Sequence, residues 1–570
     1  MRNQEIAEVF YQIADLLEIK GELPFKVRAY RRAAQRIETL EKDIEEIYRQ
    51  GKLKSIPGIG ESMARKIEEL IETGKLQYLE DLKKEVPEEL IRLMDIPGLG
   101  PKKALVLYKK LGITTIDQLR EACKQGRLRM LEGFGEITER NIMRGIEMME
   151  ESKGRALINV AYDDGYRIVE YLRQNKDVLK IEIAGSLRRM KETIGDIDIL
   201  VSSLNPDSIM DMFVKYPDVK EVLVKGSKKT SVILKDGIQV DVRVVRPESF
   251  GAALQYFTGS KDHNIQIRNL AIKKGLKINE YGVFKKDTDE YIAGRTEEEV
   301  YRAIGLQYIE PELRENRGEI ELAQQGKLPK IVKYEDVKGD FHIHSTWSDG
   351  TSSIEDIARK GEEMGLKFVG IADHSPSLKV AYGLSEEKIM EKIKEIRKLQ
   401  EKFEIRILAG TECDIKPDGT LDYSNKVLKE LDFAYAAIHS KFKMSRKEMT
   451  ERIIKAMENE YINMLAHPTV RLIGKRDPID VDLEKIFEAA KETGTFLEIN
   501  AFPDRLDLND VHAKAAKEMG AKMVIGTDSH AIDHMRFLKF GVAMARRGWL
   551  EKEDILNTYD LSKIEKMLGR

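Results

Sequence analysis

The stretch from Gly185 to Leu200, GSLRRMKETIGDIDIL, constrains the fold of this chain more than any other. An apolar run, Ile181 to Ala184, precedes it, and its end alternates acidic with apolar residues. The pattern predicts a strand, a tight turn, a short helix and a second strand. Because alternate residues of a strand share one face, Asp196 and Asp198 project from the same side and can bind divalent cations.

The beginning of this stretch predicts a phosphate-binding segment. Gly185 and Ser186 open the short helix, whose free backbone N–H groups can hold a phosphate. Arg188 and Arg189 lie in its first turn, where their guanidinium groups can bind the same anion. One unit therefore combines a phosphate cradle with a pair of metal-binding carboxylates.

A third carboxylate is predicted downstream. Residues 231–245 are typical of a hairpin with a Lys235-Asp236-Gly237 turn, and Asp241 alternates with valines on its second strand. Three such carboxylates and a triphosphate clamp meet the needs of in-line phosphoryl transfer with two Mg²⁺ ions. The alternative is that Asp196, Asp198 and Asp241 are ordinary solvated strand residues.

These motifs, with the later segment Tyr256-Phe257-Thr258-Gly259-Ser260, resemble those of family X DNA polymerases. The resemblance extends along the whole chain to the bacterial and archaeal members that carry a C-terminal polymerase-and-histidinol-phosphatase (PHP) domain. It implies a nucleotidyltransferase palm with Asp196, Asp198 and Asp241 as catalytic residues, and a template contact at Arg268. The dNTP-binding residues that it implies are Gly185, Ser186, Arg189, Tyr256, Phe257, Gly259 and Asn264.

The first 150 residues predict helices with two matched glycine turns. Ile56-Pro57-Gly58-Ile59-Gly60 and Ile96-Pro97-Gly98-Leu99-Gly100 each precede a predicted helix, which is the helix-hairpin-helix pattern. Backbone N–H groups at such a helix start contact a DNA phosphate without reading the base sequence. The expected DNA-binding residues are Gly58, Gly60, Gly98 and Gly100.

The same region resembles the lyase domain of eukaryotic DNA polymerase beta. That resemblance places Lys66 where the family has its Schiff-base lysine. Attack on a sugar aldehyde requires a neutral amine, which burial or nearby positive charge favours. Ser62 and Tyr78 stand where the family has phosphate-binding lysines. The alternative for Lys66 is a surface lysine on a DNA-binding helix.

After about residue 337 the chain alternates short apolar strands with helical stretches. Seven such units predict a distorted barrel of the TIM type with one unit missing. In such barrels chemistry gathers at the carboxyl ends of the strands. The predicted strands lie near residues 340–344, 368–372, 405–410, 433–438, 462–466, 496–499 and 523–526.

Six of the nine histidines fall at the ends of these strands together with three acids. One histidine there is more often structural, but the whole set predicts a multinuclear metal site, and these ligand types suit Zn²⁺, Mn²⁺ or Fe. Asp373, Asn500 and the basic segment Arg471 to Arg476 are candidates for supporting or substrate contacts, and the alternative for that segment is a solvated loop. The resemblance to the PHP family implies a complete set of nine ligands for three ions: His342, His344, Asp349, His374, Glu412, His439, His467, Asp528 and His530.

The 570 residues exceed what one core usually holds. The expected fold class is multidomain: all-α helix-hairpin-helix domains, an α/β palm with a small α+β thumb, and a C-terminal (β/α)7 barrel. The predicted segments are a lyase-like domain at 1–88, a second helical DNA-binding domain at 89–150, the palm at 151–245, the nucleotide-selection thumb at 246–318, a linker at 319–336 and the barrel at 337–570.

The amino-acid composition limits the kinds of partner that this chain is expected to bind. The net charge is only −3, so any nucleic-acid contact must be a local basic patch. Two distant cysteines favour a reducing cytoplasm, and the lack of an apolar stretch of about 18 residues argues against a membrane partner. A monomer is expected.

The function expected is a DNA-directed DNA polymerase that fills short gaps in gapped or nicked DNA from dNTPs, as in base excision repair. The palm would use Mg²⁺. The barrel would use three Mn²⁺ or Zn²⁺ ions as a 3′-5′ exonuclease that could also incise abasic sites. The alternative is a DNA-end binding scaffold whose barrel is a phosphatase for small phosphate esters.

Overall fold

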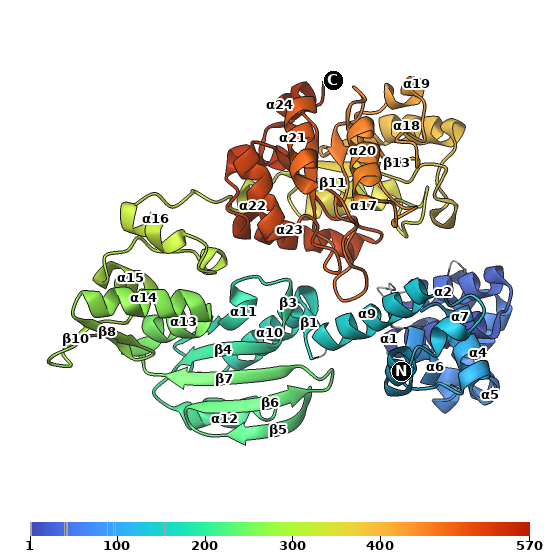
Figure 1. Ribbon diagram of the computed structural model, residues 1–570. Helices are drawn as coiled ribbons and strands as arrows, with labels where there is room; N and C mark the ends of the chain where they lie inside the picture. Colours follow the sequence, from blue (N-terminus) through green and yellow to red (C-terminus); the bar gives the residue numbers. More distant parts are fainter. Residues whose placement is uncertain are drawn as a thin grey trace. The chain divides into compact units, whose positions relative to one another are not determined.

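The computed structural model describes residues 3–38, 40, 44–56, 58–87, 89–94, 96, 99–152 and 154–569 (Figure 1). The chain divides into two compact units. One comprises residues 1–153 with 472–477, and the other comprises residues 154–471 with 478–570. Among the described helices, none combines the length and the apolar character needed to cross a bilayer.

The described residues of the first unit up to residue 152 form helices joined by short turns. Apolar side chains at helical spacing, such as Ile6, Phe10 and Ile13, are fully buried in one core that continues to Ile146. The predicted segments 1–88 and 89–150 therefore share a core. The helices are α1 (Asn3–Lys20), α2 (Pro24–Glu38), α3 (Ile44–Arg49), α4 (Glu61–Thr73), α5 (Gln77–Glu85), α6 (Glu89–Met94), α7 (Pro101–Leu111), α8 (Ile116–Lys124) and α9 (Glu136–Ser152).

The palm of the second unit is a five-stranded sheet in the order β2-β4-β7-β6-β5. Its central pair, β4 and β7, is parallel, and the other neighbours are antiparallel, including the predicted hairpin of β6 and β7. The strands are β2 (Lys180–Ile183), β4 (Asp196–Ser202), β5 (Val219–Lys225), β6 (Lys229–Leu234) and β7 (Gln239–Val245). Around them lie α10 (Ile158–Arg173), α11 (Gly185–Arg188), α12 (Pro206–Phe213) and the small pair β1 (Ala156–Leu157) and β3 (Thr193–Ile194).

The thumb follows the palm directly and combines helices with a small antiparallel sheet, as expected (Figure 1). Its sheet has the order β10-β9-β8. The elements are α13 (Phe250–Thr258), α14 (Lys261–Lys273), β8 (Leu276–Asn279), β9 (Gly282–Lys285), β10 (Tyr291–Ala293) and α15 (Glu297–Ala303).

The predicted linker, residues 319–336, contains an ordered helix, α16 (Glu319–Gln325). Ile320 and Ala323 bury one face of it in the thumb core. Glu319 is fully buried and accepts a hydrogen bond from His263 Nδ1 at 2.7 Å. Leu322 also packs against this core, so the segment is packed against the thumb.

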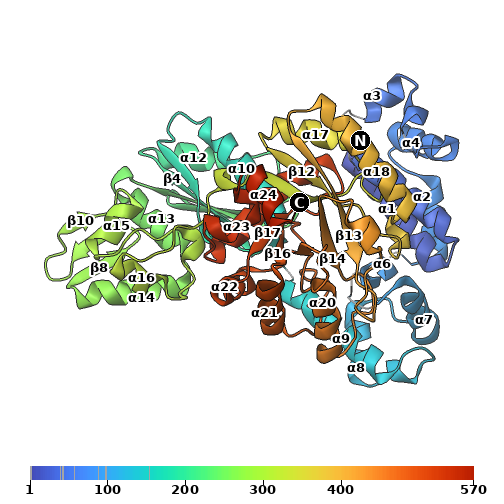
Figure 2. The same cartoon turned by 90° about the horizontal axis from the view of Figure 1, so that it is seen from above.

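The C-terminal region is a seven-stranded parallel sheet in sequential order, β11 to β17. A parallel bridge between Ile343 and Ser529 joins its two ends, so the barrel is nearly closed. Its strands are almost wholly buried, as in a parallel sheet covered by helices (Figure 2). All seven predicted strands are present: β11 (Gly339–Ile343), β12 (Phe368–Ile371), β13 (Arg406–Asp414), β14 (Phe433–Ala437), β15 (Met464–Leu465), β16 (Phe496–Asn500) and β17 (Met523–Gly526).

The barrel strands alternate with helices. A serine or asparagine side chain caps several of these helices, as Ser353 and Ser445 do. The helices are α17 (Ile354–Glu363), α18 (Glu386–Leu399), α19 (Asn425–Leu428), α20 (Arg446–Met457), α21 (Leu483–Thr493), α22 (Asp510–Met519), α23 (Leu538–Arg547) and α24 (Leu561–Met567).

Two candidate metal centres

Three aspartates converge on the central strand pair of the palm sheet. Asp198 on β4 is paired in register with Asp241 on the parallel strand β7, and Asp196 lies two residues earlier on β4. One ligand atom from each of the three lies within 4.8 Å of the others. The structure thus brings together the carboxylates that the sequence placed on two separate strands.

The charges of this cluster favour a bound cation. Burial, then repulsion from Asp196 and Asp241, raises the pKa of Asp198 to about 7. Burial opposes ionisation of Asp241 as well, but hydrogen bonds from Lys229, Ser231 and Gln239 lower its pKa. The donor set is entirely oxygen, and a divalent cation would offset the repulsion. These residues therefore fit Mg²⁺.

The predicted phosphate segment lies directly beside the aspartates. Gly185 has φ +64°, and a Cβ atom on it would lie 2.4 Å from Asp198 Oδ2, so any other residue would force the Asp198 carboxylate to move. The short helix α11 begins at this residue and carries Ser186 in its first turn. The sequence had no signal for this close approach beyond the glycine itself.

The two arginines of this segment differ in their surroundings. Arg188 donates to both carboxylate oxygens of Glu297, at 2.9 and 2.6 Å, and so joins α11 to α15. Arg189 donates from Nε to Glu315 at 3.1 Å and from Nη1 to the Thr258 carbonyl. Arg188 is thus a structural link, whereas Arg189 ties the phosphate segment to the turn after α13.

The remaining predicted nucleotide residues gather at the end of α13. Asn264 donates to the Tyr256 carbonyl at 2.7 Å and accepts from Gln255 at 2.8 Å, so its amide is engaged within the protein. The Arg268 guanidinium lies 5.5 Å from the centre of the Tyr256 ring. Gly259 has φ +70° and closely approaches Arg189. Tyr256 and Phe257 are half-buried and pack edge to face.

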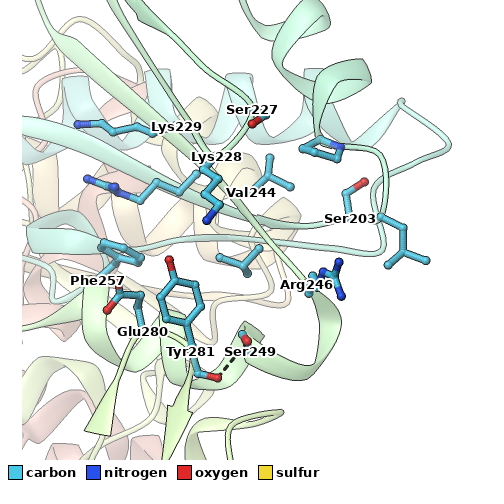
Figure 3. A pocket seen from close by; sticks show the side chains of 14 residues that line it. Ser203, Ser227, Lys228, Lys229, Val244, Arg246, Ser249, Phe257, Glu280 and Tyr281 are labelled. Carbon is cyan, nitrogen blue, oxygen red and sulfur yellow. Dashed lines mark hydrogen bonds between the residues drawn. The ribbon is translucent and has the colours of Figure 1, made fainter.

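A basic groove of about 740 Å³ begins beside the aspartates, and sequence reasoning missed it (Figure 3). Lys229 Nζ lies 2.5 Å from Asp241 Oδ2, and the Arg243 guanidinium lies 4.4 Å from the Phe257 ring centre. Lys228 and Arg246 add two further cations along the same lining. The two lysines lie just before the predicted hairpin, and Arg243 is two residues after Asp241. This closeness in sequence to Asp241 was the signal that could have predicted the groove.

Three of the four helix-hairpin-helix glycines are described, and each lies in a turn before a helix. Gly58 has φ +86°, and Gly60 caps the N-terminus of α4 in an extended conformation. Gly100 caps α7 in the same way, with proline at the first helical position. The predicted contact Gly98, like Pro57 and Pro97, lies outside the described residues.

Lys66 lies on α4 against the two residues that depart from the lyase pattern. Its Nζ donates to Ser62 Oγ at 3.0 Å and lies 4.8 Å from the centre of the Tyr78 ring. Burial lowers the pKa of Lys66, with Glu69 opposing and Lys26 assisting this shift. The environment thus moves this amine toward the neutral form.

All nine predicted barrel ligands converge. The ligand atoms form three groups, and within each group they lie within 4.8 Å of one another. The two ligands outside these groups adjoin them, because His467 Nε2 lies 2.7 Å from Glu412 Oε1 and Asp528 Oδ1 lies 3.3 Å from His344 Nε2. The three groups are His344, Asp349, His374 and His530; His342, His344 and Glu412; and His374, Glu412 and His439.

Several ligand atoms of the barrel are buried without a hydrogen-bond partner among the described residues, which leaves them open to a metal ion. His374 Nδ1 lies 2.9 Å from Glu412 Oε2, yet both atoms are buried without a hydrogen-bond partner among the described residues. Burial, then the neighbouring His530 and His374, lowers the pKa of His344 to about 4, which keeps this imidazole neutral. Burial would raise the pKa of Glu412, but the surrounding histidines hold it well below its ordinary value. Such nitrogen and carboxylate donors fit Mn²⁺ or Zn²⁺.

Other side chains hold these ligands in place, and their signals in the sequence are weak. Glu498 accepts from His342 Nδ1 at 2.6 Å and from the backbone N–H of His467 at 2.7 Å. Asp414 lies 2.9 Å from His439 Nδ1. Such carboxylates fix the tautomer of a metal-ligating histidine. A lone acid inside an apolar strand, as Glu498 is, was the usable signal.

Asn500 and Asp373, both predicted as supporting residues, differ in what they contact. Asn500 donates to Asp528 Oδ2 at 3.1 Å, so it touches a ligand directly. Asp373 accepts from Ser345 and Ser348 and lies 3.2 Å from the buried Lys392. Arg505, which was not predicted, lies 3.2 Å from Asp528 Oδ2 through its Nε atom.

Four families match parts of the chain. Residues 1–76 match the helix-hairpin-helix domain, and residues 90–147 match the SAM-like helix-hairpin-helix tandem. Residues 253–315 match the DNA polymerase beta thumb, and residues 340–502 match the PHP domain. The matches follow the order of the helical unit, the thumb and the barrel.

Known relatives divide into two kinds. The chain is 40% identical to the DNA polymerase/3'-5' exonuclease PolX of Bacillus subtilis (strain 168) over the whole of both proteins. It is 31% identical to a probable phosphatase of Thermoanaerobacter sp. (strain X514) over 40% of this chain and 93% of that protein. A probable phosphatase of Acetivibrio thermocellus is 30% identical over 34% of this chain and 78% of that protein.

Proposed function

We propose, because this chain belongs to the family X DNA polymerases with a C-terminal PHP domain, that it fills short gaps in DNA and removes 3′ nucleotides. The observation that carries this proposal is the presence of two separate ligand sets in one chain. One set is the three aspartates of the palm, and the other is the nine ligands of the barrel.

The palm is proposed to extend a primer. Asp196, Asp198 and Asp241 would hold two Mg²⁺ ions, which supply Lewis acidity toward the attacking hydroxyl and the triphosphate. Gly185 leaves room for the Asp198 carboxylate, and Ser186 and Arg189 would bind the triphosphate. The half-buried rings of Tyr256 and Phe257 would border the incoming nucleotide.

The barrel is proposed to hydrolyse phosphodiester bonds at 3′ ends. Its nine ligands would hold three Mn²⁺ or Zn²⁺ ions, which supply Lewis acidity toward water and the scissile phosphate. Glu498 and Asp414 orient the histidines that bind these ions. Incision at abasic sites is a further proposed reaction of the same centre.

Gapped or nicked DNA and dNTPs are the proposed partners. The glycine turns at Gly58, Gly60 and Gly100, together with Gly98, would bind DNA phosphates, and the groove lined by Lys228 and Arg246 would follow a strand. Lys66 is the proposed lyase nucleophile. These roles fit base excision repair by a cytoplasmic monomer.

A second function is supported for the barrel by the relatives named probable phosphatases, which match this part of the chain. In that case the barrel would act on small phosphate esters, and the rest of the chain would bind DNA ends. Two substrates distinguish the two functions: a one-nucleotide gap with a labelled primer, and a small phosphate ester.

Primer extension and 3′ nucleotide release on that gap test the proposal. Asp196→Ala should abolish extension and spare hydrolysis, and His344→Ala should do the reverse. Loss of both activities in either single variant would contradict two independent centres. Hydrolysis of the small ester without release of 3′ nucleotides would favour the second function.

A further inference from the structure

A helix of the barrel contacts the nucleotide-binding segment of the palm through one buried arginine. Arg547, in the last turn of α23, is 2% exposed. Its Nη1 donates to the Arg189 carbonyl at 2.6 Å and to Glu315 Oε1 at 3.0 Å. Both partners belong to the same compact unit as Arg547.

Glu315 connects the two arginines. The Oε1 atom that accepts from Arg547 also accepts from Arg189 Nε at 3.1 Å. Arg547 therefore supports Arg189 in two ways. It binds the backbone carbonyl of Arg189, and it binds the Glu315 carboxylate that orients the Arg189 guanidinium. Hydrogen bonds between charged groups are the stronger ones in proteins, and burial removes competition from water.

The barrel side of this contact is itself fixed. Arg547 Nη2 donates to Asp510 Oδ2 at 2.6 Å, and Arg317 donates to the same oxygen at 3.0 Å and to the Arg547 carbonyl at 3.2 Å. The guanidinium thus has partners on three segments: the end of α11, the end of the thumb at Glu315, and α22. A side chain held in this way transmits the position of one element to another.

We propose that Arg547 is a positioning residue for polymerisation, through which the barrel fixes the segment that binds the dNTP triphosphate. The inference rests on the proposed role of Arg189 in that site. The described hydrogen-bond partners of Arg547 include neither a palm aspartate of the metal cluster nor a barrel ligand. Its removal should weaken dNTP binding and leave exonuclease chemistry intact.

The adjacent residue provides a matched control. Arg546 is on the same helix, is 10% exposed at its side chain, and donates to Glu312 at 2.7 Å and to the Val332 carbonyl at 2.9 Å. Its described partners do not include Arg189 or Glu315. Arg546→Ala therefore removes a buried interdomain arginine without touching the nucleotide segment.

Steady-state gap filling with the full chain tests the inference. Arg547→Ala should raise the KM for dNTP by about 10- to 100-fold, the effect expected when a substrate-binding group is no longer held in place. The affinity for gapped DNA and the 3′-5′ exonuclease rate should stay within about twofold of the wild type. Arg546→Ala should leave the KM for dNTP unchanged, and added methylguanidinium should partly restore Arg547→Ala.

Glu315→Gln serves as a second variant, because it weakens the hydrogen bond to Arg189 but leaves the Arg547–Asp510 pair in place. It should also raise the KM for dNTP. The inference is overturned if the wild type extends primers and every folded variant of Arg547 and Glu315 has a KM within about twofold of Arg546→Ala. A wild type that does not extend primers would instead overturn the proposed polymerase function.

Discussion

Gly185 leaves the space that the Asp198 carboxylate occupies. The glycine opens α11, and Asp198 is the middle aspartate of the cluster, so the phosphate segment and the metal ligands touch through these two residues. A positive φ at Gly185 and the overlap that a Cβ would create are independent reasons for glycine. The phosphate segment and the metal-binding carboxylates of the palm are therefore in direct contact.

Gly185→Ala should lower kcat/KM for gap filling by at least about 100-fold, because the added Cβ displaces Asp198 from its place beside Asp241. Single-turnover extension of a one-nucleotide gap measures this decrease. Gly237→Ala is the matched control, since Gly237 also has a positive φ of +95° but a Cβ there meets nothing within 4 Å. Equal decreases in the two variants would show that backbone strain, and not the overlap with Asp198, causes the effect.

Replacement of Glu412 should damage the barrel centre more than replacement of any supporting residue. Glu412 belongs to two of the three ligand groups and also contacts His467. Glu412→Gln should lower the 3′-5′ exonuclease rate by at least about 1,000-fold and reduce the number of ions bound, because a central carboxylate is removed. Metal analysis of the purified variant, with exonuclease and extension assays, provides the measurement.

Asp414→Asn should reduce the exonuclease rate less than Glu412→Gln does. Asp414 holds His439 through its Nδ1 atom and is not itself one of the nine ligands. Removal of such a supporting carboxylate costs about 10- to 100-fold in metal affinity or activity. Extension should be unchanged in both variants. An exonuclease rate in Glu412→Gln equal to that of the wild type would remove Glu412 from the centre.

The barrel was predictable from the sequence for a physical reason. Parallel strands buried on both faces appear as continuous apolar runs, such as Phe368 to Ala372, and the metal ligands follow where these runs end. Helix α16 was not predictable in the same way. Its position depends on tertiary contacts, which are the buried hydrogen bond between His263 and Glu319 and the packing of its few apolar side chains against the thumb core.

The site was predictable where several residues of one type converge, and was missed where single residues act. Three aspartates and six histidines stand out by type and spacing. Glu498, Arg505 and Arg547 lie in a strand, a loop and a helix end, and only the folded chain shows what they contact. The basic groove was missed because its cations come from separate elements.

Lys66→Ala should abolish covalent trapping by borohydride on DNA with a 5′-deoxyribose phosphate, if Lys66 is the Schiff-base nucleophile. The neutral amine attacks, so the yield of the wild type should rise with pH. Because burial lowers the pKa of Lys66, this rise should level off below the ordinary value of 10.5. Lys26→Ala should move the curve toward higher pH, since Lys26 assists the shift. Unchanged trapping in Lys66→Ala would assign the reaction to another amine.

The basic groove should contribute to DNA affinity in a salt-dependent way. Lys228 is exposed, lies 5.8 Å from the Tyr281 ring centre and lines the groove with Arg246. The double variant Lys228→Ala, Arg246→Ala should weaken binding of gapped DNA and reduce the slope of log affinity against log salt by about 2, or about 1 for each phosphate that is no longer neutralised. Fluorescence anisotropy at several salt concentrations measures both quantities. Lys235→Ala, at the other end of β6 and paired with Asp218, should leave the slope unchanged. A slope in the double variant equal to that of Lys235→Ala would mean that no DNA strand follows this groove.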